Sequence, residues 1–244
     1  MMPQMNAELS LDSCFDSLNT QIQHMGFEAV IYDFTPVPLS LEGELITPSL
    51  LRMQQAPEDM QTLWSEHGYY QIDPVQRFAL NRCAPFVWSY RNPERTLLRS
   101  ILNETRSPVG DYLNDNDMAS GITVPLHLPE GGFATLTAMM RGIDKENDLT
   151  GQLAQFGLLA MQFQEQIYPF FDGKTRRCSL IELTPREREC LSYAAQGLTA
   201  KEIAAQIYRS VATVTLHLNT AVHKLGATNR VEAVVRAMHY RLLD

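Results

Sequence analysis

At 244 residues, with 45% hydrophobic and 20% charged residues, the chain can fill one large or two modest domains, which argues against a disordered protein. Its net charge of −8 is unevenly placed. From Lys174 onward it carries eleven Lys and Arg against six Asp and Glu, whereas residues 1–173 carry nine against 22. This asymmetry indicates a nucleic-acid-binding module joined to a module of another kind. A random fluctuation of charge along the chain is the alternative. Four scattered cysteines without CxxC spacing predict no metal site, disulfide or cofactor.

The first segment of the chain has acids where a signal peptide needs bases, and no apolar run approaches the length of a membrane helix. We therefore expect a cytoplasmic protein without membrane contact. The spacings typical of common enzymes, namely HExxH, GxGxxG, the Walker loop and GxSxG, do not occur. We accordingly expect no enzymatic activity and no catalytic residue.

The first two thirds of the chain mix helix and strand signals. Apolar periodicity predicts helices around 10–25, 57–69, 74–82 and 93–103. Short β-branched or aromatic runs bounded by Gly or Pro predict strands at 27–34, 85–90, 121–128 and 132–142. Only three residues separate the last two runs, so we expect an antiparallel hairpin. The predicted fold class is α+β: an α-β-α sandwich with an antiparallel sheet, followed by a small all-α domain.

A longer helical pattern covers residues 148–170. Its apolar positions are Leu149, Leu153, Leu158, Leu159, Phe163 and Ile167. This face is wide enough for the core of the chain and for a partner helix, so burial in the core and a dimer seam are both open. Asp172-Gly173 and the basic residues after it predict a linker. We place a sensor and dimerisation domain at 1–172, the linker at 173–182 and a second domain at 183–244.

Helix starts in the second domain are strongly marked. Three of them combine a Thr or Asn cap with a Glu three residues later, which is a capping box. The caps are Thr184, Thr199 and Asn229. Ser210 caps a fourth helix, 211–225, while Gly197 and Gly226 stand where helices should stop. These signals predict four short helices.

In helix 211–225 the apolar residues recur at helical spacing, and the opposite face is polar. The residues expected to face the core are Val211, Val214, Leu218, Val222 and Leu225. A short helix, a brief turn and a longer helix are typical of the helix-turn-helix, whose second helix enters the DNA major groove. An ordinary helical hairpin with a solvated polar face is the alternative.

The segments LTPRERECL, GLTAKEIAAQI and SVATVTLHLNTAVHKLGATNR resemble the DNA-binding domain of LuxR-type transcription regulators over nearly all of 183–243. The candidate DNA-binding residues are Lys201, Arg209, Ser210, Thr213, Thr215, His217, Lys224 and Arg230. Their basic members are expected to hold phosphates. The sequence departs from the family's usual basic residues at Thr215 and His223, which should weaken binding and flatten its salt dependence.

The stretch LWSEHGYYQIDPV, residues 63–75, concentrates aromatic side chains around one carboxylate, Asp73. A carboxylate among aromatic rings needs a hydrogen-bond donor, because an unpaired buried charge is costly. From the stretch alone two roles are open. Asp73 either caps the helix that begins at Pro74 or binds a ligand.

Residues 20–170 resemble the sensor domain of LuxR-type quorum-sensing regulators. The points of resemblance are Asp73-Pro74, Trp88, Gly121 and Thr137. In that family the pocket holds an N-acyl homoserine lactone. The resemblance implies that Asp73 accepts an amide hydrogen of the ligand, while a Trp and a Tyr of the family donate to its carbonyl groups.

Those two donors are replaced in this chain. Met60 stands at the family's Trp position, Trp64 at its Tyr position and Ala56 at that of a further pocket Tyr. Methionine offers no donor, so a lactone carbonyl would lose a partner here. Met60 as plain core filler is the alternative to a place in the pocket. The pair Met60 and Trp64 resembles the subgroup of LuxR solos, regulators without a cognate synthase, from plant-associated bacteria.

We therefore expect a ligand-responsive homodimer that binds a pseudo-palindromic promoter site and senses a plant-derived amine or amide. The candidate ligand-binding residues are Asp73, Trp64, Trp88, Met60, Ala56, Tyr70, Thr135, Thr137 and Gly121. A quorum-sensing regulator that answers an acyl homoserine lactone is the main alternative. A phosphorylation-driven response regulator is a more distant one, because residues 1–170 lack repeated parallel βα units.

Overall fold

A computed structural model describes residues 10–100, 107–142, 149–178 and 180–243. The N-terminal part contains α1 (Leu11–His24), β1 (Ala29–Thr35), β2 (Leu50–Gln54), α2 (Met60–Glu66), α3 (Tyr69–Ile72), α4 (Pro74–Leu80), β3 (Phe86–Ser89), α5 (Pro108–Asp115), β4 (Ser120–His127), β5 (Phe133–Met140) and α6 (Leu149–Ile167). The C-terminal part contains α7 (Pro185–Ala195), α8 (Ala200–Gln206), α9 (Val211–Lys224) and α10 (Arg230–His239).

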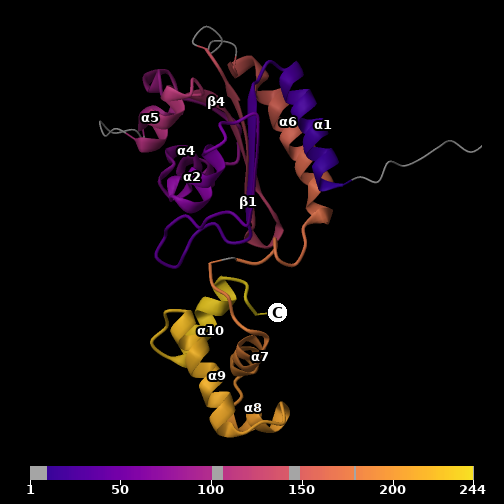
Figure 1. Cartoon of the computed structure of the whole chain (residues 1–244), viewed down its shortest axis with the longest axis vertical. Helices are drawn as coiled ribbons and strands as arrows, with labels where there is room; N and C mark the ends of the chain where they lie inside the picture. Colours follow the sequence, from indigo (N-terminus) through magenta and orange to yellow (C-terminus); the bar gives the residue numbers. More distant parts are fainter. Residues whose placement is uncertain (1–9, 101–106, 143–148, 179, 244) are drawn as a thin grey trace, which may run out of the picture.

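The five strands form one antiparallel sheet in the order β2-β1-β5-β4-β3. Helices α1 and α6 cover one face of the sheet, and α2, α4 and α5 lie on the other (Figure 1). This three-layer arrangement confirms the predicted α-β-α sandwich. The predicted hairpin is also present, since β4 and β5 pair along their length and a short 3-10 turn, Pro129–Gly131, joins them.

Strand β5 divides the core because alternate side chains point to opposite faces of the sheet. Its even-numbered residues, Ala134 to Met140, pack against α1 and α6. Its odd-numbered residues face α2 to α5. They are Phe133, Thr135, Thr137 and Met139. Two threonines and a methionine thus lie under the second helical layer, where a purely structural sheet would carry larger apolar side chains.

The C-terminal helices begin where the caps predict. Thr184 and Thr199 each close a full capping box with the Glu three residues later, and Ser210 caps α9. The prediction for Asn229 is correct only in part. Its side chain caps the amide of Glu232, but the Glu232 carboxylate returns to Thr228 and not to Asn229.

Several expected elements differ from the structure. The helix expected over 93–103 is two 3-10 turns, Pro93–Arg95 and Leu97–Ser100, because Thr96 between them is extended; residues 101–103 lie outside the described part. Strand β2 and helices α3 and α5 were not predicted. Val211 was expected in the core but is 47% exposed, since it is the first residue of α9 and points outward beside the Ser210 cap.

The two parts of the chain touch through the loop between β1 and β2. Val37 and Ile46 of this loop are buried in the same apolar cluster as the C-terminal helices. Arg236 of α10 forms an ion pair with Glu42 at 3.1 Å, and His239 Nε2 lies 2.9 Å from the carbonyl oxygen of Leu39. No helix in the described part of the chain is long and apolar enough to cross a membrane.

Candidate functional site

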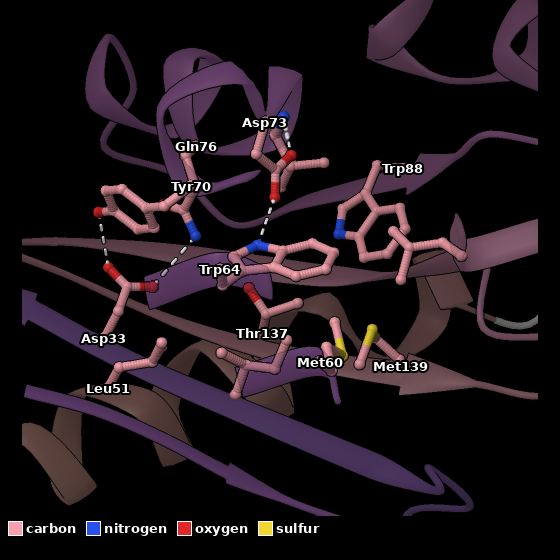
Figure 2. Close-up of a pocket in the computed structure, with 13 residues that line it drawn as sticks. Asp33, Leu51, Met60, Trp64, Tyr70, Asp73, Gln76, Trp88, Thr137 and Met139 are labelled. Atoms are coloured by element: carbon pink, nitrogen blue, oxygen red, sulfur yellow. Dashed lines mark hydrogen bonds between the residues drawn. The ribbon is translucent and has the colours of Figure 1, made fainter. Parts of the chain in front are cut away.

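A small cavity lies between the sheet and helices α2 to α5. Side chains from β1, β2, β3, β5 and all four helices meet there (Figure 2). They are Ile31, Asp33, Leu51, Met60, Trp64, Tyr70, Asp73, Val75, Gln76, Trp88, Leu113, Thr137 and Met139. Its free volume is about 20 Å³, room for roughly one water molecule. A larger ligand therefore needs some of these side chains to move.

Asp73 both caps a helix and lines the cavity, so its two predicted roles do not exclude each other. One oxygen, Oδ1, accepts the backbone N–H of Val75 at 2.9 Å and the hydroxyl of Tyr90 at 3.1 Å. The other, Oδ2, accepts the indole N–H of Trp64 at 3.2 Å (Figure 2). Trp64 thus occupies the oxygen that would receive the N–H of a ligand.

A second buried carboxylate, Asp33, was missed by sequence reasoning. It lies on β1 opposite Thr135 of β5 and accepts that residue's hydroxyl. Tyr70 donates to it at 3.0 Å and the amide of Gln76 at 3.1 Å. The available signal was an acid within the apolar and aromatic segment that follows Glu28 in the run FEAVIYDF, at alternate spacing from Ile31.

Both carboxyl groups are fully buried, and burial disfavours their charged forms. Burial raises the pKa of Asp33 to about 7, although the hydrogen bonds that it accepts lower it. Burial also raises the pKa of Asp73 to about 6, again against hydrogen bonds that favour the charged form. None of the described residues that line the cavity is Lys, Arg or His. The cavity is therefore acidic, without a cation of its own.

Six of the nine candidate ligand-binding residues line the cavity. They are Met60, Trp64, Tyr70, Asp73, Trp88 and Thr137. Thr135 lies next to the cavity and reaches it through Asp33, while Ala56 is half-buried and packs against the surrounding apolar cluster. Gly121 lies under the Trp88 ring, where an added Cβ would be 2.9 Å from the indole. Their contact with a ligand stays a prediction.

The indole N–H of Trp88 is already hydrogen-bonded within the protein. Its N–H donates to the Thr123 hydroxyl at 2.9 Å, and Thr123 lies 2.8 Å from the hydroxyl of Thr137. A ligand carbonyl would therefore have to compete with Thr123 for this donor. The same holds for Trp64, whose donor is used by Asp73.

The second candidate site is the outer face of α8, α9 and the turn between them. Lys201 on α8, Arg209 in the turn and Thr215 on α9 are exposed, as an approach to DNA requires. The Ser210 hydroxyl accepts the amide of Thr213, so its first role is to cap α9. Thr213 and His217 are half-exposed.

Two of the predicted phosphate-binding residues are held by contacts inside the domain. Lys224 forms an ion pair with Glu187 of α7 at 2.8 Å, and Arg230 donates to the carbonyl oxygen of Leu198. Although burial of Glu187 opposes its charge, the Lys224 ammonium and the Thr184 amide hold its pKa below the usual value. Contact of Lys224 and Arg230 with DNA remains a prediction, while the structure gives both a bracing role between helices.

Among the described residues, no cluster of three or more His, Cys, Asp or Glu side chains is placed to hold a metal ion. All four cysteines are free thiols, and three of them are buried.

Comparison with protein families assigns both parts of the chain. Residues 10–167 match the profile of the family described as the Autoinducer binding domain. Residues 182–237 match that of bacterial regulatory proteins of the luxR family.

Relatives and solved structures agree with this assignment. The transcriptional activator protein VanR of Vibrio anguillarum is 29% identical and covers 96% of this chain and 91% of its own. The quorum sensing-dependent transcriptional regulator RpaR of Rhodopseudomonas palustris is 30% identical over 96% of this chain and 88% of its own. A crystal structure of Escherichia coli SdiA has the same fold, with a TM-score of 0.55 at 18% identity over 98% of this chain and 94% of that chain.

Proposed function

We propose a signal for this chain on the premise that it belongs to the LuxR family of bacterial regulatory proteins and is a ligand-binding transcription regulator with an autoinducer-binding domain. The signal is a plant-derived amine or amide compound and not an acyl homoserine lactone. The protein is then a LuxR solo that takes part in plant–bacteria signalling. The single observation behind this proposal is that the hydrogen-bond donors expected for a ligand carbonyl are absent from the cavity or already bonded within the protein.

Hydrogen-bond donors for a carbonyl group of a ligand are scarce at this cavity. Met60 offers no donor, and the N–H groups of Trp64 and Trp88 already bond to Asp73 and Thr123. A lactone carbonyl left without a donor loses about 1–3 kcal/mol of binding energy, a factor of about 5 to 150 in affinity. A ligand N–H can take the place of the Trp64 indole at Oδ2 of the Asp73 carboxylate.

The proposed mechanism links the cavity to DNA binding. Ligand stabilises the sensor domain by mass action, since only the folded domain binds it. The stabilised domain forms a homodimer through α6 (Leu149–Ile167), on which Leu158 and Met161 are exposed. The dimer holds two α9 helices about one DNA turn apart, which suits a pseudo-palindromic promoter site. We place the protein in the cytoplasm, where that DNA is.

The second candidate is a quorum-sensing regulator that binds an acyl homoserine lactone. The match of residues 10–167 to the Autoinducer binding domain and the retained Asp73 favour it. One solved structure of SdiA, 17% identical, holds octanoyl-rac-glycerol, which is not a lactone. The fold thus accommodates other polar head groups.

Calorimetric titration with N-octanoyl homoserine lactone and with N-propyloctanamide separates the two candidates. We expect the wild-type protein to bind the amide at least as tightly as the lactone, and Asp73→Ala to lose the amide. Tighter binding of the lactone than of the amide by the wild-type protein would refute the proposal, whether or not Asp73→Ala loses the lactone. Asp16→Asn, a change on the exposed face of α1, is the control and should bind as the wild type does.

A further inference from the structure

We propose that Asp33 and Gln76 form a cation subsite beside Asp73, and that the effector carries a protonated amine that binds there. This inference rests on the proposed function, because it assigns a charge to the ligand of the same cavity. It adds a second recognition point, at the end of the cavity away from the Asp73–Trp64 contact.

The two acids approach the cavity from opposite layers. Asp73 and Gln76 are three residues apart at the start of α4, so they lie on the same face of that helix. Asp33 rises from β1, on the same strand face as Ile31. Figure 2 shows the Gln76 amide between the two carboxylates, turned toward Asp33.

At this point of the cavity, one hydrogen-bond acceptor has no donor among the described residues. The N–H₂ group of Gln76 is shared between Asp33 at 3.1 Å and Thr135 at 3.2 Å. Its carbonyl oxygen, Oε1, is buried and accepts no hydrogen bond from any described residue. With Asp33 ionised, the opposite orientation of the amide would place Oε1 against a carboxylate oxygen, so this orientation is assigned by charge. A buried carbonyl oxygen with no donor among the described residues can accept an N–H of a ligand.

The charge balance gives the same answer. Asp33 and Asp73 are both fully buried and accept bonds only from uncharged donors. No Lys, Arg or His lines the cavity among the described residues. A buried carboxylate without a counter-ion destabilises the folded state, whereas a neutral side chain at the same position would destabilise it little. Two such groups in a ligand-binding domain therefore point to a positive charge supplied from outside.

The bound arrangement follows from these contacts. The ammonium donates to the carboxylate of Asp33 and to Oε1 of Gln76. A second N–H, of an amide or amine, donates to Asp73 in place of the Trp64 indole. Because the free volume admits roughly one water, the Trp64 ring must move aside on binding. Trp64 thus holds the Asp73 oxygen until the ligand arrives.

A matched pair of probes tests the charge directly. N-(2-aminoethyl)octanamide ends in an ammonium group, and N-propyloctanamide is its uncharged analogue of nearly the same shape. Calorimetric titration of both into the full-length wild-type protein, Asp33→Asn and Asp73→Asn is the experiment. We expect the wild type to prefer the charged probe by about tenfold to a hundredfold, because a hydrogen bond to a charged group is the stronger kind. Asp33→Asn should abolish that preference without loss of the neutral probe.

Other outcomes separate the two proposals. Equal binding of both probes to the wild type, with loss of both in Asp73→Asn, overturns the cation subsite and leaves the proposed function standing; Asp33 is then a structural acid that keeps its proton. Binding of N-octanoyl homoserine lactone but of neither probe overturns both. Circular dichroism and thermal melting verify that each variant is folded.

A second readout needs no variant. The titratable groups facing Asp33 are Asp73 and Tyr70, and burial keeps Tyr70 neutral by raising its pKa well above the usual value. The affinity of the wild type for the charged probe should rise from pH 5 to pH 8 as the two carboxyl groups lose their protons. The affinity for the neutral probe should rise less, because it gains only from the ionisation of Asp73 and not from that of Asp33. Parallel pH profiles for the two probes would overturn the inference.

Discussion

At the scale of single residues, the sequence predicted the chemistry around Asp73 but not the second acid. Asp73 stands in a recognisable context, an Asp-Pro helix start within an aromatic stretch. Asp33 is the only acid in its strand, β1, and its partners Tyr70, Gln76 and Thr135 are 37 to 102 residues away. Local patterns contain no information about such long-range bonds.

Removal of the Asp33 charge should stabilise the ligand-free protein. Its pKa is about 7 in the native state against an ordinary 3.8, so the native state holds a proton that the unfolded chain has lost. Stability contributed by this group is complete below about pH 4 and is lost as the pH rises through 7. We expect Asp33→Asn to raise the free energy of unfolding by about 1–3 kcal/mol at pH 8.

Thermal melting between pH 4 and pH 8 checks this expectation. The gain of Asp33→Asn over the wild type should shrink toward pH 4, and the exposed control Asp16→Asn should show no gain at any pH. A variant that is less stable than the wild type at pH 8 would show that the hydrogen bonds of Asp33, and not its charge, dominate.

At the scale of elements, the strongest sequence signals were the N-caps of helices and the short β-branched or aromatic runs of strands. The starts of α7, α8 and α9 and the β4–β5 hairpin are local features, and all are confirmed. Strand β2 was missed because it is a half-buried edge strand with no clean alternation. Helix α5 was not predicted, although Ser107 followed by Pro108 is a pattern typical of a helix start.

The bracing contact between α7 and α9 makes Lys224 differ from Lys201, an exposed cation of the predicted DNA-binding face. Lys224→Met leaves Glu187 buried without its cation, and we expect a loss of about 1–3 kcal/mol of stability. Lys201→Met, at an exposed position on α8, should leave stability unchanged. It should reduce the salt dependence of binding to a random-sequence duplex by about one unit of slope.

Fluorescence anisotropy across a salt series and thermal melting together measure both effects. If Lys224→Met kept its melting temperature and lost salt dependence as Lys201→Met does, Lys224 would be a phosphate contact first and a brace second.

Helix α6 supplies the proposed dimer seam. Leu158 is 58% exposed and Met161 51%, while the rest of the apolar face packs on the sheet. A charge at Leu158 should therefore weaken association and leave the fold intact. Analytical ultracentrifugation of Leu158→Glu in the presence of ligand should show a shift toward monomer. Gln166→Glu, at an exposed position about two turns further along α6, should sediment as the wild type does; equal sedimentation of all three proteins would place the seam elsewhere.

At the scale of the whole molecule, composition predicted two parts of opposite charge but not how they meet. The contact uses the β1–β2 loop, whose Val37 and Ile46 join the core of the C-terminal helices. No local pattern marked this loop, because its apolar residues find their partners about 200 positions later in the chain, as in the bond between His239 and Leu39. The linker is held as well, since the Ser49 hydroxyl donates to the carbonyl oxygen of Thr175 at 2.6 Å.

The Glu42–Arg236 ion pair should restrain the two parts relative to each other. It is exposed on the Glu42 side, so its contribution to stability is small. Glu42→Lys should then speed tryptic cleavage within the linker, residues 173–182, by a few-fold. Glu44→Lys introduces the same charge at a nearby exposed position and is the control. Equal cleavage rates for the two variants would mean that the apolar contacts alone hold the interface.

The most direct test of the proposed function is the identity of the small molecule that the protein retains. Mass spectrometry of protein purified after expression in the presence of plant extract should reveal a compound with an amine or amide group and no lactone ring. The compound should be missing from Asp73→Asn purified in the same way. An acyl homoserine lactone retained by the wild-type protein would contradict the proposed signal.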